Sequence, residues 1–238
     1  ERWCLWLVSI APQALRAMPR VRARVDSVRT VREASTRPTT RKLAETPTVF
    51  GELRQPTTRY LAIPEVSSEN RRYVPMAFLE PDVVATNKLY TMSGATLLDF
   101  GVLSSAFHMA WTRSVCGRLK SDYQYSAGIV YNNFPWPESP TDRQRAAIEA
   151  AAQSVLDARA RFPDASLADL YDPVAMPPAL VKAHQKLDAA VDAAYGRNNF
   201  TNDAARVAFL FERYRALMEP LRTTRAKETA PETLRPRA

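Results

Sequence analysis

The sequence predicts an α+β protein in which a mixed domain of short strands and helices, residues 1–137, precedes a small all-helical domain, residues 138–221. Three observations support this. Up to Pro137, short apolar runs alternate with turn residues, whereas later apolar residues recur at helical spacing among many alanines. Pro135 and Pro137 cannot continue a central strand or a helix, so they mark the boundary. Residues 222–238 are polar and proline-bearing, which predicts a disordered tail.

The N-terminal part opens with an apolar segment, residues 2–10, which we expect to be a strand or a buried segment. A single long helix is predicted from Pro12 to Arg32, because valines recur at near-helical spacing on one side. The rest of this helix carries Arg16, Arg20, Arg22, Arg24, Arg29 and Arg32. Arginines in this arrangement can bind phosphate groups, but a solvated face on a packed helix has the same pattern.

Short extended segments are predicted next, separated by turns at Pro64 and at Glu80-Pro81-Asp82. We expect strands at residues 59–66, 71–75, 78–79 and 83–85, and further short strands or turns at 89–90 and 95–100. Residues 103–113 are predicted to be helical, with His108 as a structural histidine rather than a ligand or a base. After Pro140 the apolar spacing predicts three helices, at residues 142–162, 178–195 and 203–217, and a short helical turn at 166–171.

The stretch from Gly117 to Pro137 concentrates the polar and aromatic side chains. If it is one extended strand, alternation places four polar side chains on one face: Arg118, Lys120, Asp122 and Gln124. Such a row of donors with one acceptor is suited to reading base-pair edges, although alternating charge is also typical of a solvated sheet face. The aromatics are predicted to be mostly core rather than a stacking platform: Tyr123, Tyr125, Tyr131, Phe134 and Trp136.

Charge is unevenly distributed along the chain, whose net charge is +8. Residues 1–137 hold 18 Lys and Arg against 11 Asp and Glu, and residues 138–238 hold 15 against 14. The basic half suits a polyanionic partner, although an Arg-rich proteome produces the same excess. The two cysteines, Cys4 and Cys116, show no metal-binding spacing and are expected to be reduced thiols. No long uncharged apolar stretch predicts a membrane span.

Motifs along nearly the whole chain carry a family resemblance. Besides the stretch at 117–137, they are Arg2–Leu7, Pro64–Glu69, His108–Trp111, Leu167–Pro173 and Ala183-His184. In this order, from Arg2 to about Leu217, they resemble the MmeI-like (type IIG/IIL) enzymes, single-chain restriction-modification proteins that methylate adenine in DNA. The resemblance implies a target-recognition domain followed by a C-terminal helical domain. It also implies that the methyltransferase and nuclease domains lie upstream, outside this sequence.

The resemblance assigns Lys120 and Asp122 to the reading of one base pair, and Asn87, Lys88 and Gln124 to another specificity position. Lys120 could donate to guanine O6 and N7, and Asp122 could accept from N4 of the paired cytosine. Phosphate contacts, which position a domain without specifying sequence, are expected from Arg71, Arg72, Arg113 and Arg118.

The sequence itself lacks the motifs of a complete enzyme. It contains neither a glycine-bearing cofactor loop nor an Asn-Pro-Pro-aromatic motif, and Asn133-Phe134-Pro135-Trp136 has the wrong order. We therefore expect a non-catalytic segment without a cofactor or metal of its own. The parent would bind S-adenosylmethionine, and Mg²⁺ if it also cleaves DNA. The expected partners are double-stranded DNA and the upstream methyltransferase domain, with no membrane, in the bacterial cytoplasm. The alternatives are a protein-interaction scaffold module and a non-specific nucleic-acid binder.

Overall fold

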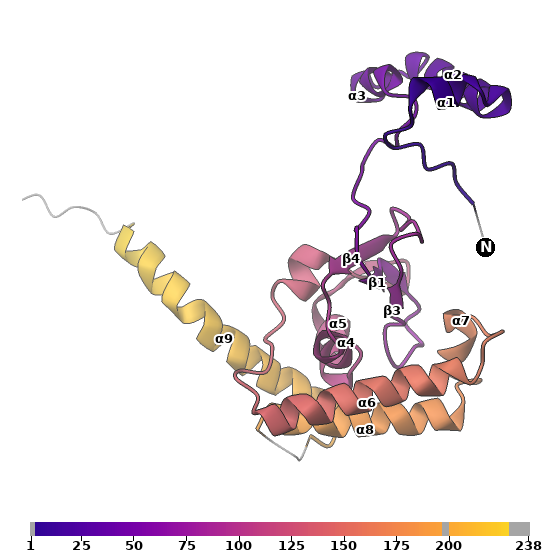
Figure 1. Cartoon of the computed structure of the whole chain (residues 1–238). Coiled ribbons are helices and arrows are strands. Elements are labelled where there is room, and N and C mark those ends of the chain that lie inside the picture. The colour runs from indigo at the N-terminus through magenta and orange to yellow at the C-terminus, as the bar shows by residue number, and fades with distance from the viewer. Residues whose placement is uncertain (1–2, 197–199, 229–238) are drawn as a thin grey trace, which may run out of the picture. The chain divides into compact units, whose positions relative to one another are not determined.

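The computed structural model describes residues 3–196 and 200–228, with side chains up to residue 219. The chain divides into two compact units, Glu1–Gln55 and Pro56–Ala238, which are described separately. Figure 1 labels their helices and the strands β1, β3 and β4. In the described residues, no helix is both long enough and apolar enough to cross a lipid bilayer.

The N-terminal unit is helical. It contains α1 (Pro12–Arg16), α2 (Pro19–Glu33), α3 (Pro38–Lys42) and a 3₁₀ turn, η1 (Leu43–Glu45). The single helix expected from Pro12 to Arg32 is wrong, because Pro19 has no N–H to continue α1 and begins a new helix instead. The strand or buried segment expected at 2–10 is also wrong for its described residues: 3–10 contain no strand, and Trp3 is 90% exposed.

Arg32 links separate parts of the N-terminal unit by donating hydrogen bonds to three backbone carbonyls. Its Nη1 donates to the oxygens of Leu43 (2.8 Å) and Thr46 (3.0 Å), and its Nη2 donates to that of Val49 (2.9 Å). This guanidinium therefore holds the segment after α3 against the end of α2. It is used inside the unit and is not available to a phosphate group in this arrangement.

The second unit contains two small antiparallel sheets. One has the strand order β3–β1–β4, and the other has the order β2–β6–β5. Their bounds are β1 Tyr60–Pro64, β2 Val66–Ser67, β3 Ala77–Leu79, β4 Leu89–Ser93, β5 Gly117–Leu119 and β6 Asp122–Gln124. Only Glu65 separates β1 from β2, so one stretch of chain passes directly from the first sheet into the second.

Two helices follow the first sheet, α4 (Leu97–Leu103) and α5 (Ala106–Val115). Thr96 caps α4 through a capping box with Asp99, so the strand or turn expected at 95–100 is wrong. The helix expected at 103–113 instead begins at Ala106, where the Ser105 side chain accepts the His108 N–H and caps it. At the starts of α4 and α5 a local side-chain cap, which periodicity does not reveal, decides where the helix begins. The strands expected at 71–75 and 83–85 are also wrong, because neither segment is a strand.

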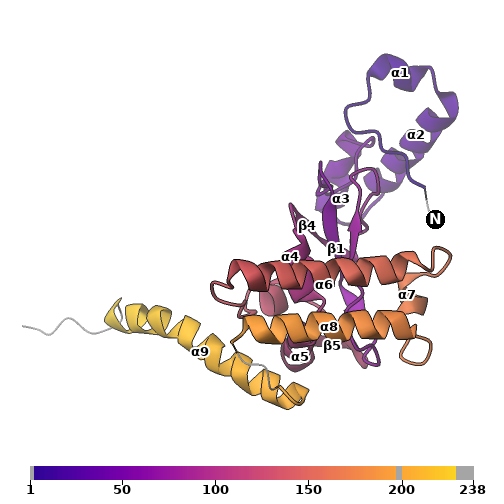
Figure 2. The same ribbon diagram turned by 60° about the horizontal axis from the view of Figure 1, so that its bottom comes forward.

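The C-terminal part of the second unit is helical. Together with the two small sheets, these helices confirm the predicted α+β class. It comprises α6 (Asp142–Ala160), α7 (Leu167–Leu170), α8 (Pro178–Ala194) and α9 (Asp203–Glu228). Helices α6 and α8 lie side by side and antiparallel, and Gln144 at the start of α6 donates to the Ala193 carbonyl near the end of α8 (Figure 2). Residues 222–228, expected in a disordered tail, are helical, and 229–238 lie outside the described residues.

One hydrophobic core runs through the whole second unit, from Leu61 on β1 to Leu210 on α9. Helix α6 packs on α4 as well as α8, and α9 packs on α5. The Trp111 indole on α5 donates to the Val130 carbonyl (3.0 Å) in η2, a π-helical turn at Ala127–Tyr131. The helices after Pro137 thus share their core with the strands before it, and the boundary at 137/138 stays a prediction.

Candidate nucleic-acid interface

The polar stretch at 117–137 begins with a tight β-hairpin. Strand β5 pairs with β6 in the register Gly117–Gln124, Arg118–Tyr123 and Leu119–Asp122, and Lys120-Ser121 forms the turn. Lys120 has a φ of +57°, the left-handed conformation that such a turn requires. The prediction of one continuous strand carrying four polar side chains on one face is therefore wrong, because the chain reverses at Lys120.

The hairpin distributes these side chains differently. Paired residues of an antiparallel ladder share a face, so Asp122 and Gln124 lie on one face and Arg118 lies with Tyr123 on the other. The guanidinium of Arg118 stacks on the Tyr123 ring, 4.2 Å from its centroid. Lys120 is exposed at the tip, and Asp122 follows it at the start of the returning strand. The two residues of the predicted base-reading pair thus flank Ser121 at the tip of the hairpin, where Lys120 is exposed and Asp122 is half-buried.

Contacts from neighbouring residues hold the hairpin tip in shape. The Arg118 guanidinium donates to the Ser121 carbonyl (2.9 Å), and it lies 3.9 Å from the Glu69 carboxylate. The Glu69 backbone N–H donates to Oδ1 of Asp122 (3.3 Å). Arg118 therefore supports the turn from within, although 43% of its side chain remains exposed for a phosphate contact.

The second predicted group, Asn87 and Lys88, lies immediately before β4 and is exposed. Glu65 connects it to the hairpin: its N–H donates to the Lys88 carbonyl (3.0 Å), and its own carbonyl accepts the Tyr125 N–H (2.7 Å) just after β6. Its carboxylate also pairs with Lys88 Nζ at 3.0 Å. Sequence reasoning missed this role of Glu65. The signal for it was Pro64, which ends β1 and makes Glu65 the link between the sheets.

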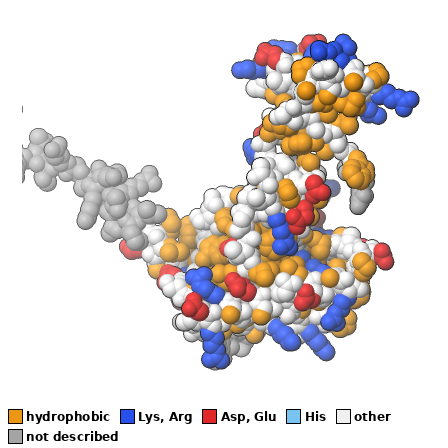
Figure 3. Space-filling model, viewed as in Figure 1, with side chains coloured by type: hydrophobic (Ala, Val, Ile, Leu, Met, Phe, Trp, Pro, Cys, Tyr) orange, Lys and Arg blue, Asp and Glu red, His pale blue; other side chains and the backbone are white. Residues whose placement is uncertain are grey.

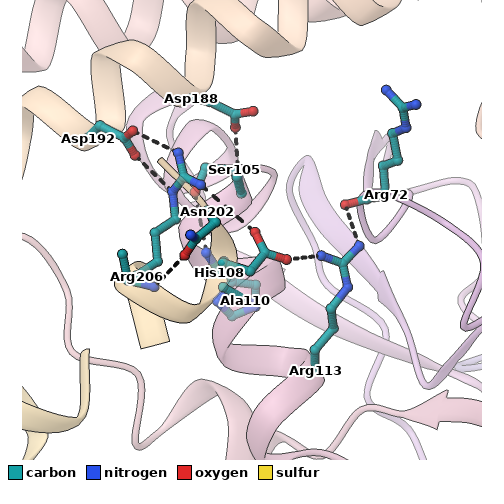
Figure 4. A network of polar contacts seen from close by, with 12 residues as sticks. Arg72, Ser105, His108, Ala110, Arg113, Asp188, Asp192, Asn202 and Arg206 are labelled. Atoms are coloured by element: carbon teal, nitrogen blue, oxygen red, sulfur yellow. Dashed lines mark hydrogen bonds and ion pairs between the residues drawn. The ribbon is translucent and has the colours of Figure 1, made fainter. Parts of the chain in front are cut away.

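The four predicted phosphate-binding arginines differ in their surroundings. Arg113 forms an ion pair with Asp203 at the start of α9, and its Nη2 donates to the carbonyls of Arg71 (3.3 Å) and Arg72 (3.5 Å) (Figure 4). Arg113 thus fastens the loop after β2 to α5 and α9. Arg71 is half-buried and Arg72 is exposed. Arg72 lines a surface hollow of about 380 Å³ together with residues of α8 that include Lys182.

The aromatic cluster is divided between core and surface. Tyr123, Tyr125 and Phe134 are buried, as predicted for core residues, whereas Tyr131 and Trp136 are partly exposed. Nε2 of His108 lies 3.0 Å from the Tyr125 hydroxyl. Complete burial lowers the pKa of His108 to about 3, so its imidazole is neutral at physiological pH. His108 therefore belongs to the interior beneath the hairpin and not to the exposed site.

A buried polar chain joins this part of the unit to the C-terminal helices. The Asp188 carboxylate on α8 accepts the Tyr73 hydroxyl (2.7 Å) and the Ala106 N–H at the start of α5 (2.7 Å). Burial raises the pKa of Asp188 to about 6. The Tyr73 ring stacks on that of His184, with 3.9 Å between centroids. Nε2 of His184 lies 2.7 Å from the Tyr171 hydroxyl. These bonds fix the segment that carries Arg71 and Arg72 against α8.

No metal-binding group stands out among the residues that the structure describes, where no three His, Cys, Asp or Glu side chains cluster suitably for an ion. Both cysteines are free thiols; Cys4 is exposed and Cys116 is partly buried. Burial raises the pKa of Cys116, which makes it a poor nucleophile.

Comparison with known proteins identifies related sequences over most of the chain. Residues 1–138 match the family "MmeI, target recognition domain", and residues 140–222 match "MmeI, C-terminal domain". DNA methyltransferase A of Bacillus subtilis (strain 168) is 39% identical over 218 residues, which are 92% of this chain and 25% of that protein.

A solved structure is similar as well. It is the type IIL restriction-modification enzyme MmeI in complex with DNA, with a TM-score of 0.87 and 49% identity over 91% of this chain and 29% of that one. The chain thus spans about a quarter of one relative and less than a third of the other. It belongs to the MmeI family, of which it contains the target recognition domain and the C-terminal domain.

Proposed function

We propose that this chain is the sequence-specific DNA-recognition module of an adenine-specific DNA methyltransferase or restriction-modification enzyme. Its family membership supports this, as does the similarity to an enzyme solved in complex with DNA. Because the chain spans only part of its relatives, we assign methyl transfer to the rest of the parent protein. That part would bind S-adenosylmethionine, and Mg²⁺ if the parent also cleaves DNA. The parent would act in the bacterial cytoplasm.

The observation that carries the proposal is the hairpin tip, where an exposed lysine and a carboxylate stand next to each other. The major groove of DNA admits a two-stranded β-ribbon, and each base pair presents a distinct donor and acceptor pattern there. Lys120 would donate to O6 and N7 of a guanine, and Asp122 would accept from N4 of the paired cytosine. Good contacts of this kind discriminate against a wrong base by about 1–3 kcal/mol.

The neighbouring residues would complete the interface. Gln124 lies on the same face of the hairpin as Asp122, and Glu65 connects the hairpin to Asn87 and Lys88, so these side chains would read a second position. Arg71, Arg72 and Arg118 would contact phosphates, which fixes the register of the domain on the duplex. Arg113 would act indirectly, because its donors already hold the backbone of Arg71 and Arg72.

The test is to map the methylated sites of the full-length parent protein, comparing wild type with Lys120→Glu/Asp122→Arg. The exchange reverses donor and acceptor, so one position of the methylated motif should change from G to C. Arg59→Glu/Glu80→Arg is a matched control, because it reverses an exposed ion pair (3.5 Å) elsewhere in the same unit and should leave the motif unchanged.

Each alternative function predicts a different result. An unchanged motif in the Lys120/Asp122 variant would refute the assignment of these two side chains. A parent that binds DNA with strong salt dependence but without any site preference would be a non-specific binder. A parent that binds no DNA, but retains a protein partner, would be the interaction scaffold.

A further inference from the structure

The N-terminal unit has almost no hydrophobic core of its own. Among residues 3–55, only Val25 and Ala44 are buried hydrophobic side chains, with 6% and 7% of their surface exposed. Domains near 60 residues are only marginally stable even when they bury about 60% of their surface. Two buried side chains, one of them an alanine, are too few to hold three helices together, so this unit needs a further surface to pack against.

The unit also exposes large hydrophobic side chains. In the described residues, 15 large hydrophobics are classed as exposed, and eight of them lie in this unit although it is less than a quarter of the chain. They are Trp3, Leu5, Trp6, Met18, Val28, Val31, Phe50 and Leu53. Trp6 stacks on Phe50, with 5.7 Å between ring centroids, so part of this surface is continuous. Figure 3 shows hydrophobic side chains over much of the visible face of the unit.

The size of this surface is that of an interaction site. Trp3 is 90% exposed, Trp6 42% and Phe50 45%. A large aromatic side chain has roughly 150–250 Å² to bury, so these three together leave on the order of 300 Å² uncovered. The largest contiguous apolar patch on a typical soluble monomer covers about 300–600 Å² and is often functional, and larger patches mark interaction sites.

The charge of the unit limits what can bind there. Residues 1–55 hold 11 Lys and Arg against five Asp and Glu. Arg32 and Arg41 donate to backbone carbonyls within the unit, whereas Arg20 and Arg24 are exposed on α2. A complementary surface would therefore be apolar at its centre and would carry carboxylates at its edge.

We propose that the exposed apolar face of the N-terminal unit is covered, in the parent protein, by a surface of the same polypeptide that lies outside these 238 residues. The region that matches this chain makes up only 25% of DNA methyltransferase A and 29% of the solved MmeI chain. Most of each relative's polypeptide therefore lies outside the matched region. A tethered partner has a high effective concentration, so a patch smaller than a standard interface is sufficient. This inference does not depend on how DNA is read.

Site-specific photo-cross-linking in the full-length parent tests the proposal. Benzoylphenylalanine would replace Trp6 or Leu53 in separate variants, and cross-linked peptides would be identified by mass spectrometry. The expected cross-links join these positions to peptides outside the 238 residues. Val174, which is 95% exposed in the second unit, is the control position and should give no such intramolecular cross-link. Cross-links confined to residues 1–238, links between separate molecules, or no links at all would overturn the proposal.

A stability measurement provides an independent readout. Trp6→Ser/Leu53→Ser should lower the Tm of the full-length parent by several degrees, because polar side chains would then occupy an apolar contact. Val174→Ser should leave the Tm unchanged. If the double variant behaves like Val174→Ser, the face is not covered and the proposal is wrong.

Discussion

Gly101 on α4 lies at a close approach between the strand-containing part of the second unit and the C-terminal helices. A Cβ atom placed there would lie 2.7 Å from Cγ2 of Ile148 on α6, and 3.3 Å from Cβ of Ala152 and from Cδ1 of Leu187 on α8. Carbon atoms in van der Waals contact lie about 3.5–4.0 Å apart. Gly101→Ala therefore tests whether these helices share one core.

The expected cost follows from how little the neighbours can move. The clashing methyl of Ile148 is attached to Cβ of a β-branched residue, whose χ1 is nearly fixed in a helix, and Ile148 is fully buried. Overpacking of this kind costs about 1–3 kcal/mol. Alanine is more favourable than glycine within a helix by up to about 1 kcal/mol, which offsets part of this cost. We expect Gly101→Ala to reduce the free energy of unfolding by about 1–2 kcal/mol.

Urea unfolding of the 238-residue chain, followed by circular dichroism, would measure this loss. Ile148→Ala alone should cost about 2–5 kcal/mol through the cavity that it leaves. In Gly101→Ala/Ile148→Ala, the new methyl group enters that cavity. The double variant should therefore lose at least about 1 kcal/mol less than the sum of the single changes. Additive losses, or a Gly101→Ala protein more stable than wild type, would refute this packing of α4 on α6.

Two further predictions concern buried and half-buried charge. Burial lowers the pKa of His108 and His184 to about 3 and raises that of Asp188 to about 6. Between pH 6 and pH 4, unfolding therefore lets the two histidines take up one proton each, while Asp188 releases one. Stability should then fall by roughly 1.4 kcal/mol per unit as the pH is lowered, and urea titrations that show no such slope would contradict this. Arg113→Gln breaks the ion pair with Asp203, but both side chains are partly exposed, so stability should fall by only about 1 kcal/mol. Because Arg113 is proposed to hold a loop rather than a phosphate, the salt dependence of DNA affinity should not change; a shallower slope in binding titrations would show a direct phosphate contact.

The sequence predicted α8 well, because a proline and a glycine mark its two ends, although the similar start of α2 at Pro19 was missed. Pro178 begins α8, and Gly196, with a φ of +76°, follows its end as expected. Prediction from the sequence failed at the hairpin, because Lys120 adopts a left-handed conformation without the glycine or asparagine that usually signals such a turn. Read as a strand, the same residues give perfect alternation. The periodicity correctly placed Asp122 and Gln124 on one face, but it wrongly placed Arg118 with them, and it missed that Lys120 lies in a turn.

Longer-range contacts could not be predicted from local patterns. Arg113 was predicted to contact phosphate, but its ion pair with Asp203, 90 residues later in the chain, was not predicted. Glu65 was not singled out, because its importance comes from one backbone bond to each of two loops that are distant in sequence. Pairing between such residues depends on the tertiary fold, which composition and periodicity do not encode.

The structure separates the residues proposed to read DNA from those that hold the fold. Lys120 is exposed at a turn, while the adjacent Tyr123 and Tyr125 enter the core and fix the position of the strand beneath it. Lys120 is an exposed turn side chain, so exchanging it should alter recognition at little cost in stability. Asp122 is half-buried and accepts the Glu69 N–H, so its exchange should cost about 1 kcal/mol more, which is too little to unfold the unit. Changes at Tyr125 should do the opposite, because its ring is buried and its hydroxyl meets His108. If the proposed residues read DNA, a new specificity would require only a few substitutions at the hairpin while the core stays the same.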